Sequence, residues 1–181
     1  MSDKSSGVEK LLSKISENRK NQILFIVFAC LSLAVMITVF LFSNQPAAES
    51  SAVSSVFSDI FLDIFDFKAE DLPFDINSLE TILRKLAHFT LFSALGFFLS
   101  SAAINLKGEK LFKKLSIAAF IGILYCATDE IHQLFVPQRS GEIRDVLIDT
   151  GGVIFGTLCA FVLYKLICLI SKKNQKNKIS T

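Results

Sequence analysis

The chain has 181 residues, of which 51% are hydrophobic and 20% are charged, and its formal net charge is +2. This length suits one domain, and the composition excludes a disordered chain, a collagen-like repeat and a disulfide-stapled secreted module. The basic residues flank apolar runs and do not form one stripe. A globular nucleic-acid-binding protein is therefore disfavoured, and we expect no nucleic-acid partner.

Four runs of the sequence are long and apolar enough to cross a bilayer, which requires about 20 residues. They cover residues 22–42, 85–104, 115–136 and 146–170. Four buried helices of a soluble protein would leave too little polar sequence to cover the outside of so short a chain. The sequence therefore predicts an all-α, polytopic membrane helix bundle with four transmembrane helices. A cleaved signal peptide is an alternative for the first run, but its apolar core exceeds the about 7–15 residues of such signals, which favours an uncleaved anchor.

The charges between the runs orient the predicted bundle. Both chain ends and the link at 105–114 are rich in lysine, whereas the segment 43–83 carries eight acidic residues against Lys68 alone. By the positive-inside rule, both termini face the cytoplasm and the acidic segment lies outside. We expect a basic cytoplasmic tail at 1–20, a transmembrane domain at 21–170 and a second basic tail at 171–181.

The segment 51–67, within the acidic stretch, has the pattern of an amphipathic helix. Its apolar side chains recur at helical spacing, and Asp59, Asp63 and Asp66 lie on the other side. Such a helix lies along the outer membrane surface or over the bundle. Solvation explains the acidic face more simply than a dedicated partner site does.

In this topology, polar residues that are distant in sequence meet at the extracytoplasmic end of the bundle. They are Arg84, Lys85 and His88 of the second run, Asp129, Glu130, His132 and Gln133 of the third, Arg139 and Arg144 of the following link, and Asp145 and Asp149 of the fourth run. Acids and bases that only pair at helix ends are one interpretation. Their number, their one-sidedness and the presence of both histidines favour the other interpretation, a water-filled pocket that binds a ligand.

Helical spacing indicates which residues of the third run share a face. Tyr125, Asp129, His132 and Gln133 fall on one stripe, and Glu130 is turned aside from it. Asp129 lies about 10 Å along the helix from the predicted end of the span, which places it below the headgroups. An ionisable side chain at that depth is costly unless it is paired or hydrated.

The fourth run has a second stripe of this kind. Asp145 and Asp149 lie on the same side as Gly152 and Gly156. The two glycines have the small-xxx-small spacing that lets a neighbouring helix approach closely. We therefore expect the acidic stripe to point into the bundle.

The sequence predicts neither a metal nor a cofactor. All four cysteines lie inside the apolar runs, where they behave as small apolar residues, and no CxxC or Cys–His spacing indicates zinc. The two histidines, His88 and His132, belong to different predicted helices and are a weak ligand signal. For the carboxylates, ion pairing is favoured over metal binding.

Three segments carry a resemblance to a known family: FSNQPAAES, RKLAHF and TDEIHQLFVPQRSGEIRDVLIDTGGVIFG. They resemble the VanZ-like family of bacterial membrane proteins, from about Phe42 to Phe161. The resemblance implies a multi-pass protein of the bacterial cytoplasmic membrane. The family's namesake is associated with resistance to teicoplanin-type glycopeptides without remodelling of the D-Ala-D-Ala target. The signature positions carried over from the family are Ser43, Gln45, Arg84, Lys85, His88, Asp129, Glu130, Gln133, Arg139, Asp145 and Asp149.

Three functions are compatible with these residues. The favoured one is a binding or resistance factor at the outer leaflet, whose arginine and lysine hold a phosphate or carboxylate of a lipid-linked precursor or a lipidated glycopeptide. The second is an intramembrane enzyme in which His88 or His132 is the general base, and Asp129 or Glu130 orients it or binds a divalent ion. No nucleophile motif or nucleotide loop supports that enzyme. The third, a small transporter or flippase subunit, ranks last because the chain lacks inverted repeats.

Overall fold

The computed structural model describes the backbone of residues 2–64, 66–67, 75–139 and 141–179, and the side chains of most of them. The acidic segment's Lys68, Glu70 and Asp71 lie outside the described residues. Five α-helices follow one another, and the described residues contain no strand. The helices are α1 (Ser2–Ser43), α2 (Ala47–Ile64), α3 (Ile76–Ile104), α4 (Leu111–Gln133) and α5 (Ile143–Ile179).

Four of these helices contain a stretch long and apolar enough to cross a membrane. The stretches are Lys14–Ser43, Ile76–Ile104, Leu111–Gln133 and Ile143–Lys173. The predicted all-α fold with four spans is confirmed. The helices differ in extent from the apolar runs: α3 begins at Ile76, before the run that starts at residue 85, and α4 ends at Gln133, before the end of the run at residue 136.

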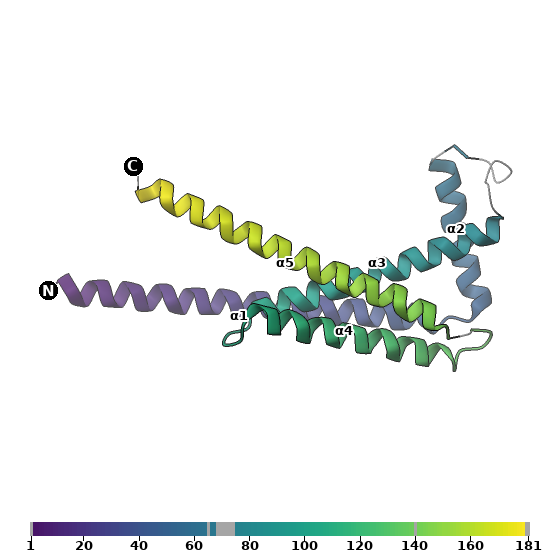
Figure 1. Ribbon diagram of the computed structural model, residues 1–181, viewed down its shortest axis with the longest axis horizontal. Coiled ribbons are helices and arrows are strands. Elements are labelled where there is room, and N and C mark those ends of the chain that lie inside the picture. The colour runs from purple at the N-terminus through teal and green to yellow at the C-terminus, as the bar shows by residue number, and fades with distance from the viewer. Residues whose placement is uncertain (1, 65, 68–74, 140, 180–181) are drawn as a thin grey trace.

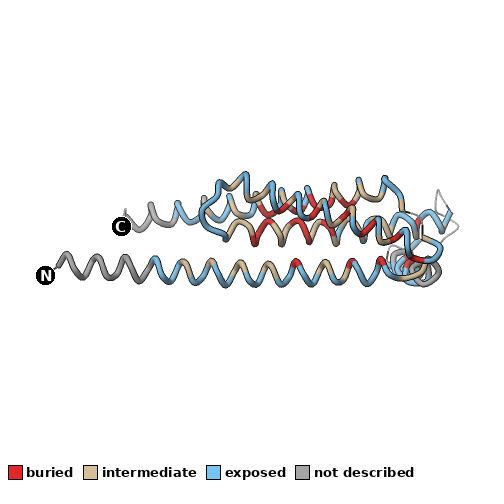
Figure 2. The backbone as a smooth tube through the Cα atoms, turned by 90° about the horizontal axis from the view of Figure 1, so that it is seen from below, coloured by how far each residue is buried: buried red, intermediate tan, exposed pale blue. Residues whose placement is uncertain are grey.

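The long helices run along one common direction, with the two chain ends at one end of the bundle (Figure 1). The link between α4 and α5 lies at the opposite end, together with α2. α3 is the central helix, since it packs against each of the other four. The buried core is formed by Val39, Phe92, Leu95, Cys126 and Val153, and buried positions follow the inner faces of the helices (Figure 2).

The contact between α3 and α5 is close because glycines replace side chains there. A Cβ atom on Gly152 would lie 2.6 Å from the Phe89 carbonyl oxygen, and one on Gly156 would overlap the Ser93 carbonyl. Further along the same contact, the Ser100 hydroxyl donates to Thr157 Oγ1 at 3.0 Å. The predicted small-residue contact is therefore confirmed, and it turns the acidic stripe of α5 inward.

α2 crosses the direction of the spans and packs on α3 (Figure 1). Among its described side chains, Ser54 and Ser58 are buried. Five of the described apolar side chains are exposed, namely Val53, Val56, Phe57, Ile60 and Ile64. The helix is thus amphipathic as predicted, but its apolar face is turned away from the bundle. Of the two expected arrangements, this favours lipid contact over packing of that face on the protein, and the extracytoplasmic location stays a prediction.

Substituting alanine at Gly156 tests the close contact of α3 with α5. We expect Gly156→Ala to lower the free energy of unfolding by about 1–3 kcal/mol, because the new methyl group forces the two backbones apart. Gly151→Ala is the matched control, since its Cβ would meet only Phe89 Cε2 at 3.8 Å. Because alanine has the higher helix propensity, by about 1 kcal/mol, the control should be neutral or stabilising. Unfolding in mixed micelles measures both, and equal stabilities would contradict the contact.

Candidate functional site: a charged cavity at the end of the bundle

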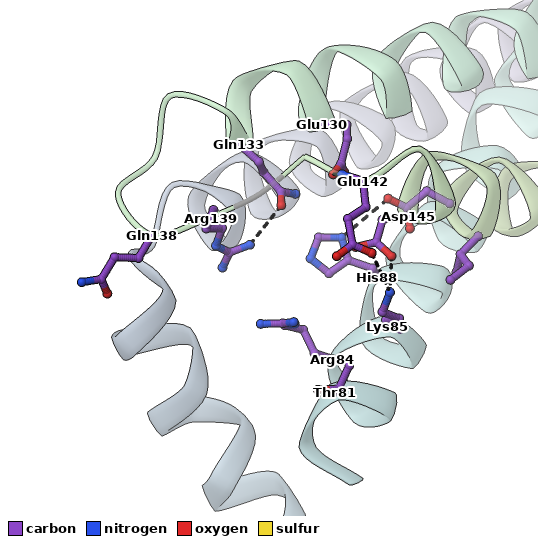
Figure 3. Close-up of a pocket in the computed structure, with 12 residues that line it drawn as sticks. Thr81, Arg84, Lys85, His88, Glu130, Gln133, Gln138, Arg139, Glu142 and Asp145 are labelled. Atoms are coloured by element: carbon purple, nitrogen blue, oxygen red, sulfur yellow. Dashed lines mark hydrogen bonds and ion pairs between the residues drawn. The ribbon is translucent and has the colours of Figure 1, made fainter. Parts of the chain in front are cut away.

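A cavity of about 160 Å³ lies where α3, α4, α5 and the link between α4 and α5 meet (Figure 3). Its lining is predominantly polar and charged. The lining residues are Thr81, Arg84, Lys85, His88, Glu130, Gln133, Gln138, Arg139, Glu142, Asp145, Ile148 and Asp149. Eight of the eleven polar residues that the topology had brought together thus line one cavity, and Asp129, His132 and Arg144 do not.

One wall of the cavity is formed by the facing ends of α3 and α5. Lys85 forms an ion pair with Asp145, and its Nζ lies 3.8 Å from Glu142 Oε2. One turn deeper, His88 Nδ1 lies 3.7 Å from Asp149 Oδ2, and the Asp149 side chain is almost fully buried. The two helices therefore present complementary charges to each other in register, one turn after another.

A buried hydrogen-bond network around Asp129 lies between the cavity and α1, and Gln133 connects it to the cavity lining. The Ser43 hydroxyl donates to Asp129 Oδ2 at 2.9 Å, and Gln133 Nε2 donates to the same oxygen at 3.1 Å. Asp129 is only 4% exposed, although it lies just one turn before the end of α4. Its depth thus comes from coverage by α1 rather than from the longer span that the sequence had predicted.

Arg139 fastens the link between α4 and α5 to the end of α1. Its guanidinium donates to the carbonyl oxygens of Gln45 and Phe42, at 3.0 and 3.3 Å, and to Gln133 Oε1 at 3.3 Å. A cation is favourable at a helix C-terminus. Burial lowers the pKa of Arg139 below its ordinary value, and the neighbouring Arg84 lowers it further. An arginine nevertheless stays charged in a protein.

Arg84 is the one cationic group of the lining without a partner among the described residues. It reaches the cavity from α3, on the side opposite Lys85's ion pair (Figure 3). Arg139 lies near enough for the two positive charges to repel each other. Two guanidinium groups that face one cavity, one of them unpaired, form an arrangement that a phosphate or carboxylate would stabilise.

Glu130 separates this cavity from a second, apolar groove of about 230 Å³. Its Oε1 accepts the backbone N–H of Glu142 at 2.6 Å, which holds the start of α5 against the end of α4. The groove is lined by Ala127, Glu130, Ile131, Leu134, Gly141, Glu142, Ile143 and Val146. A charged cavity and an apolar groove therefore share Glu130 and Glu142 as a common wall.

Besides Asp129, two candidate residues lie outside the cavity lining. His132 stacks on Phe40 of α1 with ring centroids 4.9 Å apart, and its buried Nε2 has no hydrogen-bond partner among the described residues. Arg144 is exposed and lines neither space. The stripe on α4 exists as predicted but faces α1, so His132 points to α1 while Glu130, expected to turn aside, reaches the cavity.

Four further residues line the cavity without a sequence pattern that indicates them, namely Thr81, Gln138, Glu142 and Ile148. Glu142 is the informative one, because it lies in a short link between Arg139 and Arg144. An acid flanked by two bases between two spans is a signal for local ion pairing. The partner that the structure gives it is Lys85 of α3, which no local pattern identifies.

The fold and the cavity together define a class: a polytopic helical membrane protein whose charged residues gather at one end of the bundle. The family model described as VanZ/LLP1 matches residues 28–165. The chain therefore belongs to the VanZ/LLP1 family. No curated protein and no solved structure gives a significant match to the chain.

Cysteine labelling tests on which side of the membrane the cavity opens. In a chain without its native cysteines, we expect Gln138→Cys to react with an impermeant thiol reagent added to intact cells, because Gln138 is exposed at the cavity. Lys110→Cys, exposed in the basic link between α3 and α4, should react only after permeabilisation. The reverse pattern would invert the topology, and the cysteine-free chain gives the background.

Proposed function

We propose that this protein binds the anionic headgroup of an amphiphile in the cavity at the extracytoplasmic end of the bundle. The amphiphile is a lipid-linked envelope precursor or a lipidated glycopeptide. Through this binding the protein contributes to teicoplanin-type glycopeptide resistance, or to envelope homeostasis, in the bacterial cytoplasmic membrane. The two ligands share one chemistry, a phosphate or carboxylate attached to a long apolar chain.

The observation that carries the proposal is Arg84, which faces Arg139 across the cavity and has no partner among the described residues. A guanidinium without a counter-ion in a half-buried position favours binding of an anion from outside the chain. Arginine is suited to this task because its planar donors match the oxygens of phosphate and carboxylate. Lys85 is less available because Asp145 and Glu142 already neutralise it.

The apolar groove beside the cavity supports an amphiphilic ligand over a soluble anion. It lies between the end of α4 and the start of α5, and it shares Glu130 and Glu142 with the cavity. Exposed apolar residues such as Ile131 and Leu134 line it. A headgroup held by Arg84 would therefore leave its chain next to an apolar surface at the same depth. Family membership agrees with such a role, since the resemblance to the namesake implies resistance to lipidated glycopeptides.

Direct binding tests the headgroup site. We expect the full-length protein in detergent, in the presence of EDTA, to bind a polyprenyl pyrophosphate but not the uncharged polyprenol, as measured by native mass spectrometry. Arg84→Gln should weaken binding about tenfold, because a charge-assisted hydrogen bond contributes about 1.5–3 kcal/mol. Arg144→Gln is the matched control: it removes the same charge from the same end of the bundle without altering the cavity, and should bind like the wild type. Equal weakening in both variants would indicate attraction by surface charge alone.

Susceptibility of cells tests the physiological role. A strain expressing the chain should be protected against teicoplanin but not against vancomycin, because only teicoplanin carries an acyl chain that places it at the membrane surface. Arg84→Gln should lose the protection at an unchanged membrane level of the protein, measured by immunoblot, and Arg144→Gln should keep it. Absence of protection by the wild type would remove the resistance role and leave the binding site to be explained by envelope lipids.

An enzyme is the second candidate function, and the proximity of His88 to Asp149 is the observation that favours it. A carboxylate beside an imidazole on the wall of a cavity can orient it for proton transfer. Incubation with the same polyprenyl pyrophosphate distinguishes the two functions. Release of inorganic phosphate that His88→Gln abolishes would establish the enzyme, whereas binding without turnover would leave the receptor function.

A further inference from the structure

We propose that His88, Asp129 and Asp149 together bind one divalent metal cation beside the cavity, which His88 and Asp149 line. The sequence had favoured ion pairs and no metal, because its two histidines lie far apart and in different helices. The folded chain brings one of them, His88, together with two carboxylates. One residue comes from each of three helices, α3, α4 and α5.

The geometry of the three residues is that of a loosely assembled ligand set. One ligand atom from each residue can be chosen so that all three lie within 4.8 Å of one another. Ligand atoms around a zinc-like ion lie about 2.0–2.2 Å from the metal, hence about 3–4 Å from each other. A bound ion would therefore have to draw the three side chains closer together. His88 Nδ1 and Asp149 Oδ2 are already at 3.7 Å.

The charge balance of the cluster points to a missing cation. Asp129 and Asp149 are 4% and 2% exposed, and among the described residues neither has a lysine or arginine within ion-pair distance. Asp149 lines the cavity, and its only partner in the described chain is His88, beyond direct hydrogen-bond distance. Two buried carboxylates beside a single imidazole are costly within the span of a membrane protein. A divalent ion would compensate both charges.

The residues around the cluster fit the outer shell of a metal site. Ser43 and Gln133 both donate to Oδ2 of Asp129, and Arg139 in turn donates to Gln133 Oε1. Such partners fix the orientation of a ligating carboxylate. One imidazole and two carboxylates suit Zn²⁺ or Mn²⁺, and three protein ligands leave a coordination position open. That position would face the cavity lined by Arg84 and Arg139.

Metal binding by the purified protein tests the site directly. We expect the full-length chain, stripped with EDTA and dialysed against Mn²⁺ or Zn²⁺, to retain one ion per chain by elemental analysis. Co²⁺ should give the visible absorption bands of a site with a nitrogen ligand, and His88→Gln should shift them. Asp129→Asn and Asp149→Asn, which preserve side-chain shape, should each weaken Mn²⁺ binding at least tenfold.

Asp145→Asn is the matched control, because it removes a carboxylate from the cavity lining. Unlike Asp129 and Asp149, Asp145 already forms an ion pair with Lys85. It should keep the Mn²⁺ affinity of the wild type within about threefold, while melting temperatures verify that all variants are folded. Absence of a stoichiometric ion in the wild type would overturn the proposal, and so would an equal loss in Asp145→Asn. If the asparagine variants fail to fold, the Co²⁺ spectrum of His88→Gln decides, because an unshifted spectrum would exclude His88 as a ligand. The anion-binding test of the proposed function is done in EDTA, without a metal ion. A failure of the metal site and a failure of the anion site can therefore be distinguished.

Discussion

The close contact between α3 and α5 is the constraint on which the rest of the site depends. Glycines of α5 let its backbone lie directly on that of α3, around Phe89 and Ser93. Towards the end of the bundle that holds the cavity, the same two faces carry His88 and Asp149, and then Lys85 and Asp145. Side chains as short as aspartate reach a partner on another helix only when the backbones are this close. The apolar part of the contact between α3 and α5 therefore determines which charged side chains meet in its polar part.

The remaining sides of the cavity are closed by polar side chains that bind backbone groups. Arg139 caps the carbonyl oxygens at the end of α1, and Glu130 accepts the N–H of Glu142 at the start of α5. Each of these groups would be unsatisfied in a membrane without its partner, where water cannot replace it. The link between α4 and α5 is thus held to the end of α1 by Arg139 and to α4 by Glu130.

The sequence predicts the helices and the side of the bundle on which polar residues meet, because hydropathy and charge are properties of contiguous segments. It also predicts the inward orientation of Asp149, because the nearby glycines identify the packed face of α5. It could not predict that Asp129 would be buried against Ser43 or that His132 would stack on Phe40. Both depend on where α1 lies relative to α4. Helical spacing defines a stripe but not the neighbour that the stripe faces.

The charges around the cavity are divided into a negative and a positive region. The buried carboxylates of Asp129 and Asp149 lie together next to His88, and Asp149 lines the cavity. Arg84 lines another part of it without a partner among the described residues, and Arg139 lies nearby. In a site of low dielectric, each charged region attracts a ligand of the other sign. The two carboxylates therefore favour a cation, and the arginine side favours an anion. A phosphate held by Arg84 would have its oxygens directed at the positive charge of an ion between the carboxylates. The buried carboxylates and the arginine each cost free energy without a counter-ion. With both bound, the metal cation and the phosphate would therefore stabilise each other.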